Sequence, residues 1–386
     1  MSSPSADLSP FDLMDEWGPE KVVCVSDTRT GMRGVLVIDN TARGMGKGGT
    51  RMAPTVTVRE IARLARVMTL KWASVDMFYG GAKAGIVADP ASPDKEAVLR
   101  AFARALSNEV PAEYVFGLDM GLTEDDGAIL LDELGRGTSV GTPHSLGGLP
   151  YDELGVTGFG VAESASAATR WCGDDLRGAR VVVQGFGAVG VAAAERLTAL
   201  GASVVGISTG AGALHDPTGL DVAELVALRR THGDALVHHH DAAPVALGAE
   251  LELDCDVLVP AATQDVVDED LAGRIKARVV VEGANLPTSP AAQEVLRERG
   301  VVVVPDFIAN AGGVIAAGYA MDARFSAFRP DPAPVLDTIA TRLRANTTAV
   351  LDSARDREES THRAARRLAE ERVRAAMAAR RRLPAR

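Results

Sequence analysis

The chain has 386 residues, enough for two or three domains of ordinary size. Its net charge of −11 argues against nucleic acid as a main partner, because phosphate binding needs a basic face. No run approaches the ~20 apolar residues of a membrane span, and the N-terminal segment lacks the basic and apolar regions of a secretory signal. We therefore expect a soluble, cytoplasmic protein without a membrane partner.

The three cysteines, Cys24, Cys172 and Cys255, are far apart and odd in number, so they predict neither a disulfide framework nor a metal site. The histidine run at 238–240 is predicted to be a polar surface stretch. Three consecutive side chains cannot all face one ion from regular structure.

Two strand patterns open the first 150 residues, "KVVCVSD" (21–27) and "GVLVIDN" (34–40). A helix is predicted over 57–75, because its apolar residues form one stripe: Ile61, Leu64, Ala65, Met68 and Val75. Lys71 follows Leu64 by seven residues, about 20° away on the helical wheel. We therefore expect Lys71 on the buried face of this helix.

Lysine is rare in this chain, with only six among the 41 basic residues, yet three lysines fall at 47, 71 and 83. Lys47 in "GMGKGGTR" and Lys83 in "GGAKAG" are flanked by glycines, which predicts loops where backbone and ligand come close. A buried amine near other cations can have its pKa lowered toward working pH, whereas arginine stays protonated. These positions are therefore candidates for functional amines.

A general acid or base should accompany such amines. Asp119 in "EYVFGLDMGLTEDD" is the candidate, since it comes before the acids that are predicted to open the next helix. A helix N-cap is the alternative role for this residue.

A βαβ pattern begins near residue 178 with "VVVQGFGAVG", which carries G-x-G-x-x-G between a strand and an Ala-rich helix. The three glycines allow a tight turn, close approach of a pyrophosphate, and close packing of helix on strand. The pyrophosphate is expected at the helix N-terminus. The candidate cofactor-binding residues of this turn are Gly185, Phe186, Gly187, Ala188, Val189 and Gly190.

The next strand ends in Ser208 and Thr209, where an acid often binds the adenosine ribose. With neither an acid nor an arginine there, the choice between NAD and NADP stays open. Further strands are predicted at 255–261, 277–285 and 301–306, and helices after about 325.

Together these stretches resemble the glutamate/leucine/phenylalanine/valine dehydrogenase family. The resemblance rests on the order of "KGGTRM", "LARVMTLKWA", "YGGAKAGIVADP", "GLDMG", "GVTGFGV", "VVVQGFGAVG", "VEGANLPTSPAA" and "PDFIANAGGVIAAGY", and on the twelve-residue step between two lysines. It implies an α/β fold of two domains about a cleft. Residues 1–150 would bind substrate and mediate oligomerisation, 151–328 would form a Rossmann-like NAD(P)-binding domain, and 329–386 would return as helices to the first domain.

The resemblance also implies an activity, the reversible NAD(P)-dependent deamination of an L-amino acid to the 2-oxo acid and ammonium by a homo-oligomer. Lys71 would hold the substrate α-carboxylate. Lys83 would activate the water that adds to the imine, and Asp119 would shuttle the proton of the amino group. The nicotinamide side would be lined by Thr157, Asn285 and Asn310.

The substrate signals of the family disagree in this chain. Lys47 stands where glutamate-specific members use a lysine for the side-chain carboxylate, but Ala317 stands where they usually place a serine. We favour glutamate and keep a leucine- or valine-type enzyme as the alternative. An inactive cofactor-binding assembly partner is an alternative of another class, which the retention of Lys71, Lys83 and Asp119 disfavours.

Overall fold

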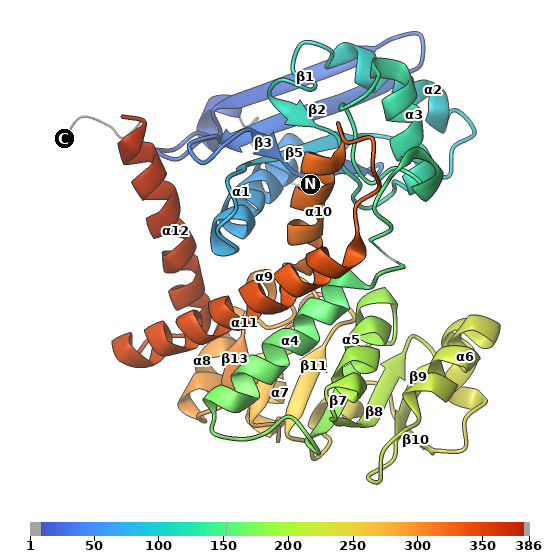
Figure 1. The fold of residues 1–386 in the computed structure, drawn as a ribbon, viewed down its shortest axis with the longest axis vertical. Coiled ribbons are helices and arrows are strands. Elements are labelled where there is room, and N and C mark those ends of the chain that lie inside the picture. The colour runs from blue at the N-terminus through green and yellow to red at the C-terminus, as the bar shows by residue number, and fades with distance from the viewer. Residues whose placement is uncertain (1–8, 152, 382–386) are drawn as a thin grey trace, which may run out of the picture. The chain divides into compact units, whose positions relative to one another are not determined.

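The computed structural model describes residues 9–151 and 153–381. Residues 1–8, part of the segment in which no secretory signal is expected, lie outside the described residues. The chain divides into two compact units (Figure 1). Unit 1 comprises Met1–Pro150, Ala317–Asp331 and Ala369–Arg386, and unit 2 comprises Tyr151–Ala316 and Pro332–Leu368.

This division differs from the predicted one in the last third of the chain. Ala317–Asp331 belongs to unit 1 rather than to the Rossmann-like domain, and Pro332–Leu368 belongs to unit 2 rather than returning to the first domain. The second difference has a simple cause, since Val350, Leu351 and Ala354 are buried in the core of unit 2. After Leu368 the chain is again part of unit 1.

Unit 1 is built on a six-stranded sheet in the order β1-β2-β5-β3-β6, with β4 paired to β5. Its strands are β1 (Lys21–Asp27), β2 (Met32–Asn40), β3 (Gly46–Lys47), β4 (Thr50–Met52), β5 (Gly80–Ile86) and β6 (Tyr114–Val115). Its helices are η1 (Pro10–Leu13), α1 (Val58–Ser74), α2 (Lys95–Ala105), α3 (Glu124–Leu134) and η2 (His144–Leu146).

The sheet of unit 1 has a core on each face. On one face, Leu36 and Ala84 pack against α2 and α3. On the other face, Val35 and Val37 pack against α1 (Figure 1). The central strand β5 is therefore buried on both sides along its whole length.

Unit 2 is built on a seven-stranded sheet in the order β10-β9-β8-β7-β11-β12-β13, whose last five strands are parallel. Its strands are β7 (Arg180–Gln184), β8 (Ser203–Thr209), β9 (Gly212–His215), β10 (Ala243–Val245), β11 (Val257–Pro260), β12 (Val279–Val281) and β13 (Val302–Val304). All the strands predicted for this part are present, and the antiparallel β9–β10 extension is an addition.

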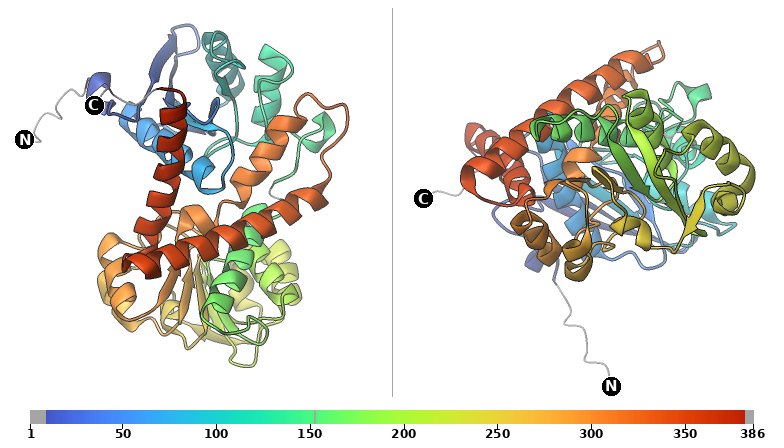
Figure 2. Two further views of the ribbon diagram at one scale, coloured as in Figure 1. Left: turned by 60° about the vertical axis from the view of Figure 1, so that its left-hand side comes forward. Right: turned by 90° about the horizontal axis from the view of Figure 1, so that it is seen from below.

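Helices cover both faces of this sheet (Figure 2). They are α4 (Val156–Trp171), α5 (Ala188–Ala199), α6 (Val222–His232), η3 (Gly233–His238), η4 (Ala249–Glu252), α7 (Glu269–Arg274), α8 (Pro290–Glu298), α9 (Asp306–Ala309) and α11 (Pro332–Arg357). Two further helices, α10 (Gly312–Ala323) and α12 (Thr361–Ala379), begin in unit 2 and end in unit 1. None of the described helices is both long and apolar enough to cross a bilayer.

Candidate active site

Lys83 lies in the middle of β5, so the predicted loop at "GGAKAG" is wrong. Side chains alternate along the strand, and Ala82, Ala84 and Ile86 enter the core that faces α2. Lys83 therefore shares the opposite face with Gly81 and Gly85. A Cβ at Gly85 would lie 2.7 Å from the Ile61 side chain of α1, so the glycines serve close packing of helix on strand.

The amine of Lys83 forms an ion pair with Asp119, with 2.8 Å between Nζ and Oδ1. The other oxygen of Asp119 accepts a hydrogen bond from Nε of Arg51 at 2.8 Å. Arg51 in turn pairs with Glu60 on α1, with 2.7 Å between Nη1 and Oε1. Arg51 and Glu60 were not among the predicted site residues, although "KGGTRM" contains the arginine.

Burial sets the electrostatics of this pair. It lowers the pKa of Lys83, whose side chain is 6% exposed, although Asp119 opposes the effect. Burial alone would raise the pKa of Asp119, but Lys83 and Arg51 outweigh it and hold this pKa below its ordinary value. Asp119 thus stays ionised while Lys83 can release a proton more easily than a free lysine.

Lys71 stands in the last turn of α1. The fully buried stripe of this helix runs through Ile61, Ala65, Thr69 and Trp72, so the predicted placement of Lys71 on the buried face is wrong. Lys71 is half-buried at the border of the stripe.

Lys47 is almost fully enclosed, with 2% of its surface exposed. Its Nζ donates to the carbonyl oxygens of Gly48, Val115 and Phe116 at 3.4, 2.9 and 3.2 Å. Burial, with the charges of Lys83 and Arg324, lowers the pKa of Lys47 to about 7. The three acceptors match the three N–H donors of an ammonium and oppose this lowering.

The glycine-rich turn of unit 2 has the geometry expected for a dinucleotide. Gly185 has a φ of 88°, a backbone conformation that residues with a side chain rarely adopt. A Cβ at Gly190 would overlap the Gly185 carbonyl, whereas a Cβ at Gly187 would meet nothing within 4 Å. The open space at Gly187, beside an α5 N-terminus without a side-chain cap, fits a pyrophosphate.

Ser208 and Thr209 are buried, and their hydroxyl groups make internal contacts. Ser208 Oγ accepts a hydrogen bond from the Gly185 amide at 3.0 Å. Thr209 Oγ1 donates to the Asp234 carbonyl at 2.7 Å. Both residues thus shape the end of β8 rather than present a free hydroxyl.

An acid does reach the end of β8, from further along the chain. Asp234 of η3 lies beside Gly210, where a Cβ would be 2.8 Å from its carboxylate. The same carboxylate is paired with Arg229 of α6. Sequence reasoning missed Asp234, because it looked for the acid only where the strand ends.

Asn285 and Asn310 come together in unit 2, with 3.0 Å between Asn310 Nδ2 and Asn285 Oδ1. Asn310 also donates to the Gly283 carbonyl at 3.3 Å. Thr157 lies at the start of α4, next to Gly313, where a Cβ would be 3.2 Å from its Oγ1. The structure therefore gathers the three residues that were expected on the nicotinamide side around the adjoining ends of α4, α9 and α10.

A buried acidic network supports this corner. Glu282 Oε2 accepts hydrogen bonds from the Asp306 amide at 2.9 Å and lies 2.9 Å from His362 Nε2. Asp306 Oδ2 accepts from the Leu286 amide at 2.8 Å, which holds the backbone next to Asn285. Nothing in the sequence linked these residues, which come from three distant segments.

The Glutamate/Leucine/Phenylalanine/Valine dehydrogenase family matches residues 147–381, and the Glu/Leu/Phe/Val dehydrogenase dimerisation domain matches residues 19–136. The chain belongs to this dehydrogenase family. The resemblance and the two-domain α/β fold class inferred from the sequence are thereby confirmed.

Individual relatives of this dehydrogenase carry more specific names. Glutamate dehydrogenase A2 of Halobacterium salinarum is 38% identical over 288 residues, which are 72% of this chain and 69% of that protein. The NAD-specific glutamate dehydrogenase of Staphylococcus aureus (strain COL) is 40% identical over 286 residues, 71% of this chain and 68% of that protein.

Solved structures agree along nearly the whole dehydrogenase chain. The leucine-bound form of the hetero-hexameric glutamate dehydrogenase from Thermus thermophilus has a TM-score of 0.82 at 32% identity, covering 96% of this chain and 92% of that one. Glutamate dehydrogenase from Peptoniphilus asaccharolyticus has a TM-score of 0.83 at 27% identity, covering 94% and 92%.

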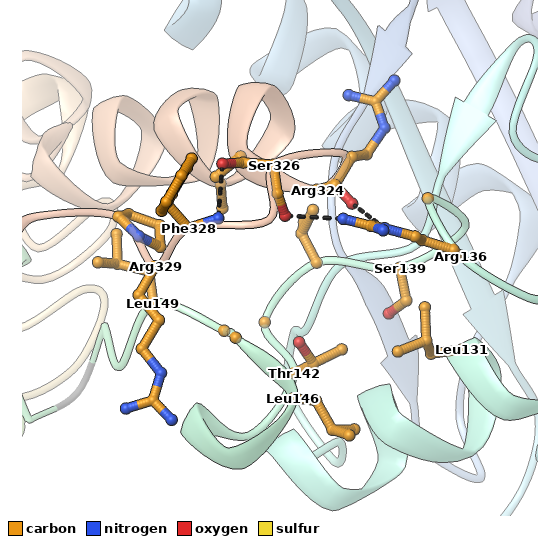
Figure 3. Close-up of a pocket in the computed structure, with 18 of the residues that line it drawn as sticks. Leu131, Arg136, Ser139, Thr142, Leu146, Leu149, Arg324, Ser326, Phe328 and Arg329 are labelled. Atoms are coloured by element: carbon orange, nitrogen blue, oxygen red, sulfur yellow. Dashed lines mark hydrogen bonds between the residues drawn. The ribbon is translucent and has the colours of Figure 1, made fainter.

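A cavity of about 490 Å³ lies in unit 1 of this dehydrogenase, between the loop that follows α3 and the segment after α10 (Figure 3). Arg136 closes one side by donating from Nη2 to the Ser326 carbonyl at 2.7 Å. The guanidinium of Arg324 points away from Arg136 and Thr142 in Figure 3. The guanidinium of Arg324 thus lies on the side of this residue that faces away from the cavity.

Proposed function

We propose that this chain catalyses the reversible NAD(P)-dependent oxidative deamination of an L-amino acid, with glutamate as the favoured substrate. The observation that carries the proposal is the Lys83–Asp119 ion pair of 2.8 Å on a rigid central strand. Support also comes from relatives that are named glutamate dehydrogenases.

In this proposal three polar groups of unit 1 act on the substrate. Lys71 binds the substrate α-carboxylate. Lys83, with its lowered pKa, takes the proton of the attacking water and then stabilises the carbonyl oxygen. Asp119, whose side chain is 23% exposed, receives the proton of the amino group. Positioned proton transfers of this kind contribute about 10²–10⁴-fold to a rate.

Unit 2 supplies the cofactor site. When bound, the nicotinamide accepts the hydride from the substrate Cα. Gly185 and Gly190 shape the turn, Gly187 leaves room for the pyrophosphate, and the α5 N-terminus favours its charge. Thr157, Asn285 and Asn310 orient the nicotinamide.

The leucine- or valine-type alternative gains support from one observation. An unpaired ammonium in an apolar pocket is costly, which argued from sequence for an acidic substrate. The backbone carbonyls that accept from Lys47 remove this cost without any substrate carboxylate. Lys47 therefore does not by itself require glutamate.

We also propose that the chain self-associates through unit 1. The match of residues 19–136 to a family domain named for dimerisation supports this. The inactive assembly partner is disfavoured, because Lys83, Asp119 and Arg51 retain a complete ion-pair network. Light scattering coupled to gel filtration measures the assembly state.

The deciding experiment is a panel of L-amino acids incubated with NAD or NADP at alkaline pH, where deamination is favoured. Reduction of the cofactor with glutamate supports the favoured reaction, and reduction with leucine or valine supports the alternative. A protein that binds NAD but reduces it with no amino acid is the assembly partner instead. Lys83→Ala serves as the matched inactive control.

A further inference from the structure

The C-terminal half of α10 lies on two aromatic residues at the end of α1. Gly318 lies close to Met77 and Trp72, because a Cβ there would overlap the end of the Met77 side chain and lie 3.8 Å from the Trp72 ring. The ring centroids of Trp72 and Tyr79 are 4.8 Å apart, and Tyr79 Oη donates a hydrogen bond to Asp322 Oδ1 at 3.4 Å. These contacts fix the last turns of α10 against the start of β5.

The same aromatic pair connects α10 to Lys47. Trp72 Nε1 donates to the Lys47 carbonyl at 2.9 Å. Ala317, the position on α10 that sequence reasoning placed at the substrate, is one residue before Gly318 and therefore belongs to this corner of unit 1. Substitution of its expected serine by alanine removes a hydroxyl donor from the corner.

Arg324 directly follows the last residue of α10. It comes seven residues after Ala317, which is about 20° away on a helical wheel. Side chains of a helix lean toward its N-terminus, and Arg324 Nη1 donates to the Met321 carbonyl, three residues back. The arginine thus runs back along the α10 face that carries Ala317.

The guanidinium of Arg324 lacks an anion among the hydrogen bonds and ion pairs of the described residues. Its Cζ lies 4.6 Å over the Phe325 ring, and its Nε is buried without a hydrogen-bond partner. Its charge acts on Lys47 and on Tyr79. A guanidinium without an anionic partner calls for one, and it binds carboxylates through paired N–H groups.

We propose that Arg324 is the specificity residue that binds the side-chain carboxylate of a dicarboxylic amino acid, with Lys47 adding its charge. This inference rests on the proposed deamination and assigns its substrate class. Lys47 keeps its hydrogen bonds to backbone carbonyls. Arg324 forms the direct contact with the substrate carboxylate, because its Nε has no hydrogen-bond partner in the part of the chain that the structure describes.

The test compares Arg324→Leu with wild type in kcat/KM for glutamate and for norvaline, which has a similar chain without the carboxylate. The expected loss with glutamate is ~10²-fold, as when a charged pair loses one partner. The kcat/KM of Arg324→Leu for norvaline should equal or exceed that of wild type. Arg324→Lys keeps the charge but not the paired N–H groups, so its kcat/KM for glutamate should fall between those of wild type and Arg324→Leu.

Arg329→Leu is the matched control, because Arg329 lies on the same segment but contacts His144. Arg329→Leu should leave kcat/KM for glutamate and for norvaline unchanged. Binding of glutarate, measured by calorimetry in the presence of NADH, should weaken in Arg324→Leu and not in Arg329→Leu. This second measurement does not depend on turnover.

Three results separate the possibilities. A glutamate-to-norvaline ratio that stays at its wild-type value in a folded Arg324→Leu protein overturns the inference. A glutamate-to-norvaline ratio that falls in Lys47→Met but not in Arg324→Leu also overturns the inference. It would show that Lys47 binds the side-chain carboxylate. A wild-type protein that deaminates norvaline and leucine but never glutamate overturns the inference while the amino acid dehydrogenase activity stands.

Discussion

Lys83 and Asp119 form an ion pair of 2.8 Å between a central strand and the loop that follows β6. The lysine cannot swing away, because β5 is buried on both faces. The aspartate is held from its other oxygen by Arg51. For the proton transfers proposed above, a pair with this little freedom meets the condition for efficient acid–base catalysis.

Removal of the Lys83 amine should abolish most turnover. We expect Lys83→Ala to lower kcat by at least ~10³-fold while NAD binding is kept, because the lost interaction belongs to the transition state. Lys83→Arg should also fail, since a guanidinium cannot act as a neutral amine. Steady-state kinetics and NAD titration by fluorescence provide the two measurements, and a near-normal kcat in either variant would exclude Lys83 as the base.

The glycine turn offers a matched pair of substitutions. Gly187→Ala places its methyl group in open space, so its melting temperature should equal that of wild type while NAD affinity falls. Gly190→Ala drives a methyl group into the Gly185 carbonyl and should lower the melting temperature as well. Calorimetric unfolding and NAD titration separate the effects. Unchanged NAD affinity in Gly187→Ala would place the pyrophosphate elsewhere.

Asp234 should give this enzyme a preference for NAD. Its carboxylate lies next to Gly210 at the end of β8 and would repel a 2′-phosphate. Asp234→Ser removes the repulsion and leaves Arg229 without its partner. The ratio of kcat/KM for NAD over NADP should fall by at least about tenfold, ~1.4 kcal/mol. Asp241→Ser, at an exposed acid outside β8 and η3, is the control. An unchanged ratio in Asp234→Ser would show that Asp234 does not read the ribose.

Lys47 should make stability depend on pH. Burial lowers its pKa in the folded protein to about 7, against an ordinary value of 10.5. Between these values the unfolded chain binds the extra proton, so stability rises with pH over that window and is flat below it for this group. Lys47→Met lacks this dependence. The difference in unfolding free energy, wild type minus variant, should therefore increase from pH 7 to pH 9 in denaturant titrations. A difference that stays constant would mean that the carbonyl acceptors keep Lys47 charged.

The sequence predicted the parallel strands of unit 2 well, because buried strands such as Val302–Val304 are short apolar runs between turn residues. It failed at Lys83 for a physical reason. Glycines at Gly81 and Gly85 suggest a loop, but in β5 they let α1 approach the strand. Only the neighbouring helix distinguishes the two, and helix packing is not visible in a local pattern.

The geometry of the glycine turn could be predicted because it is local, whereas contacts that the fold supplies were missed. Gly185, Gly187 and Gly190 could be read from their spacing, since each acts within one turn. Asp234 reaches the end of β8 from η3, which follows β9 and α6 in the chain, and Arg51 reaches Asp119 from β4. Such residues become visible only when the chain is folded.

The end of α12 packs on Ala42 and Ala73 through Ala369, Val373 and Met377. Arg372 of the same helix donates to the carbonyls of Ala73 and Ser74 at 2.9 and 2.8 Å, and so closes the C-terminal end of α1, where Lys71 stands. Chains are made from the N-terminus, and domains usually fold as they emerge. Here unit 1 is completed by residues that are translated after the whole of unit 2, so a nascent chain keeps the apolar surface around Ala73 uncovered until α12 has emerged.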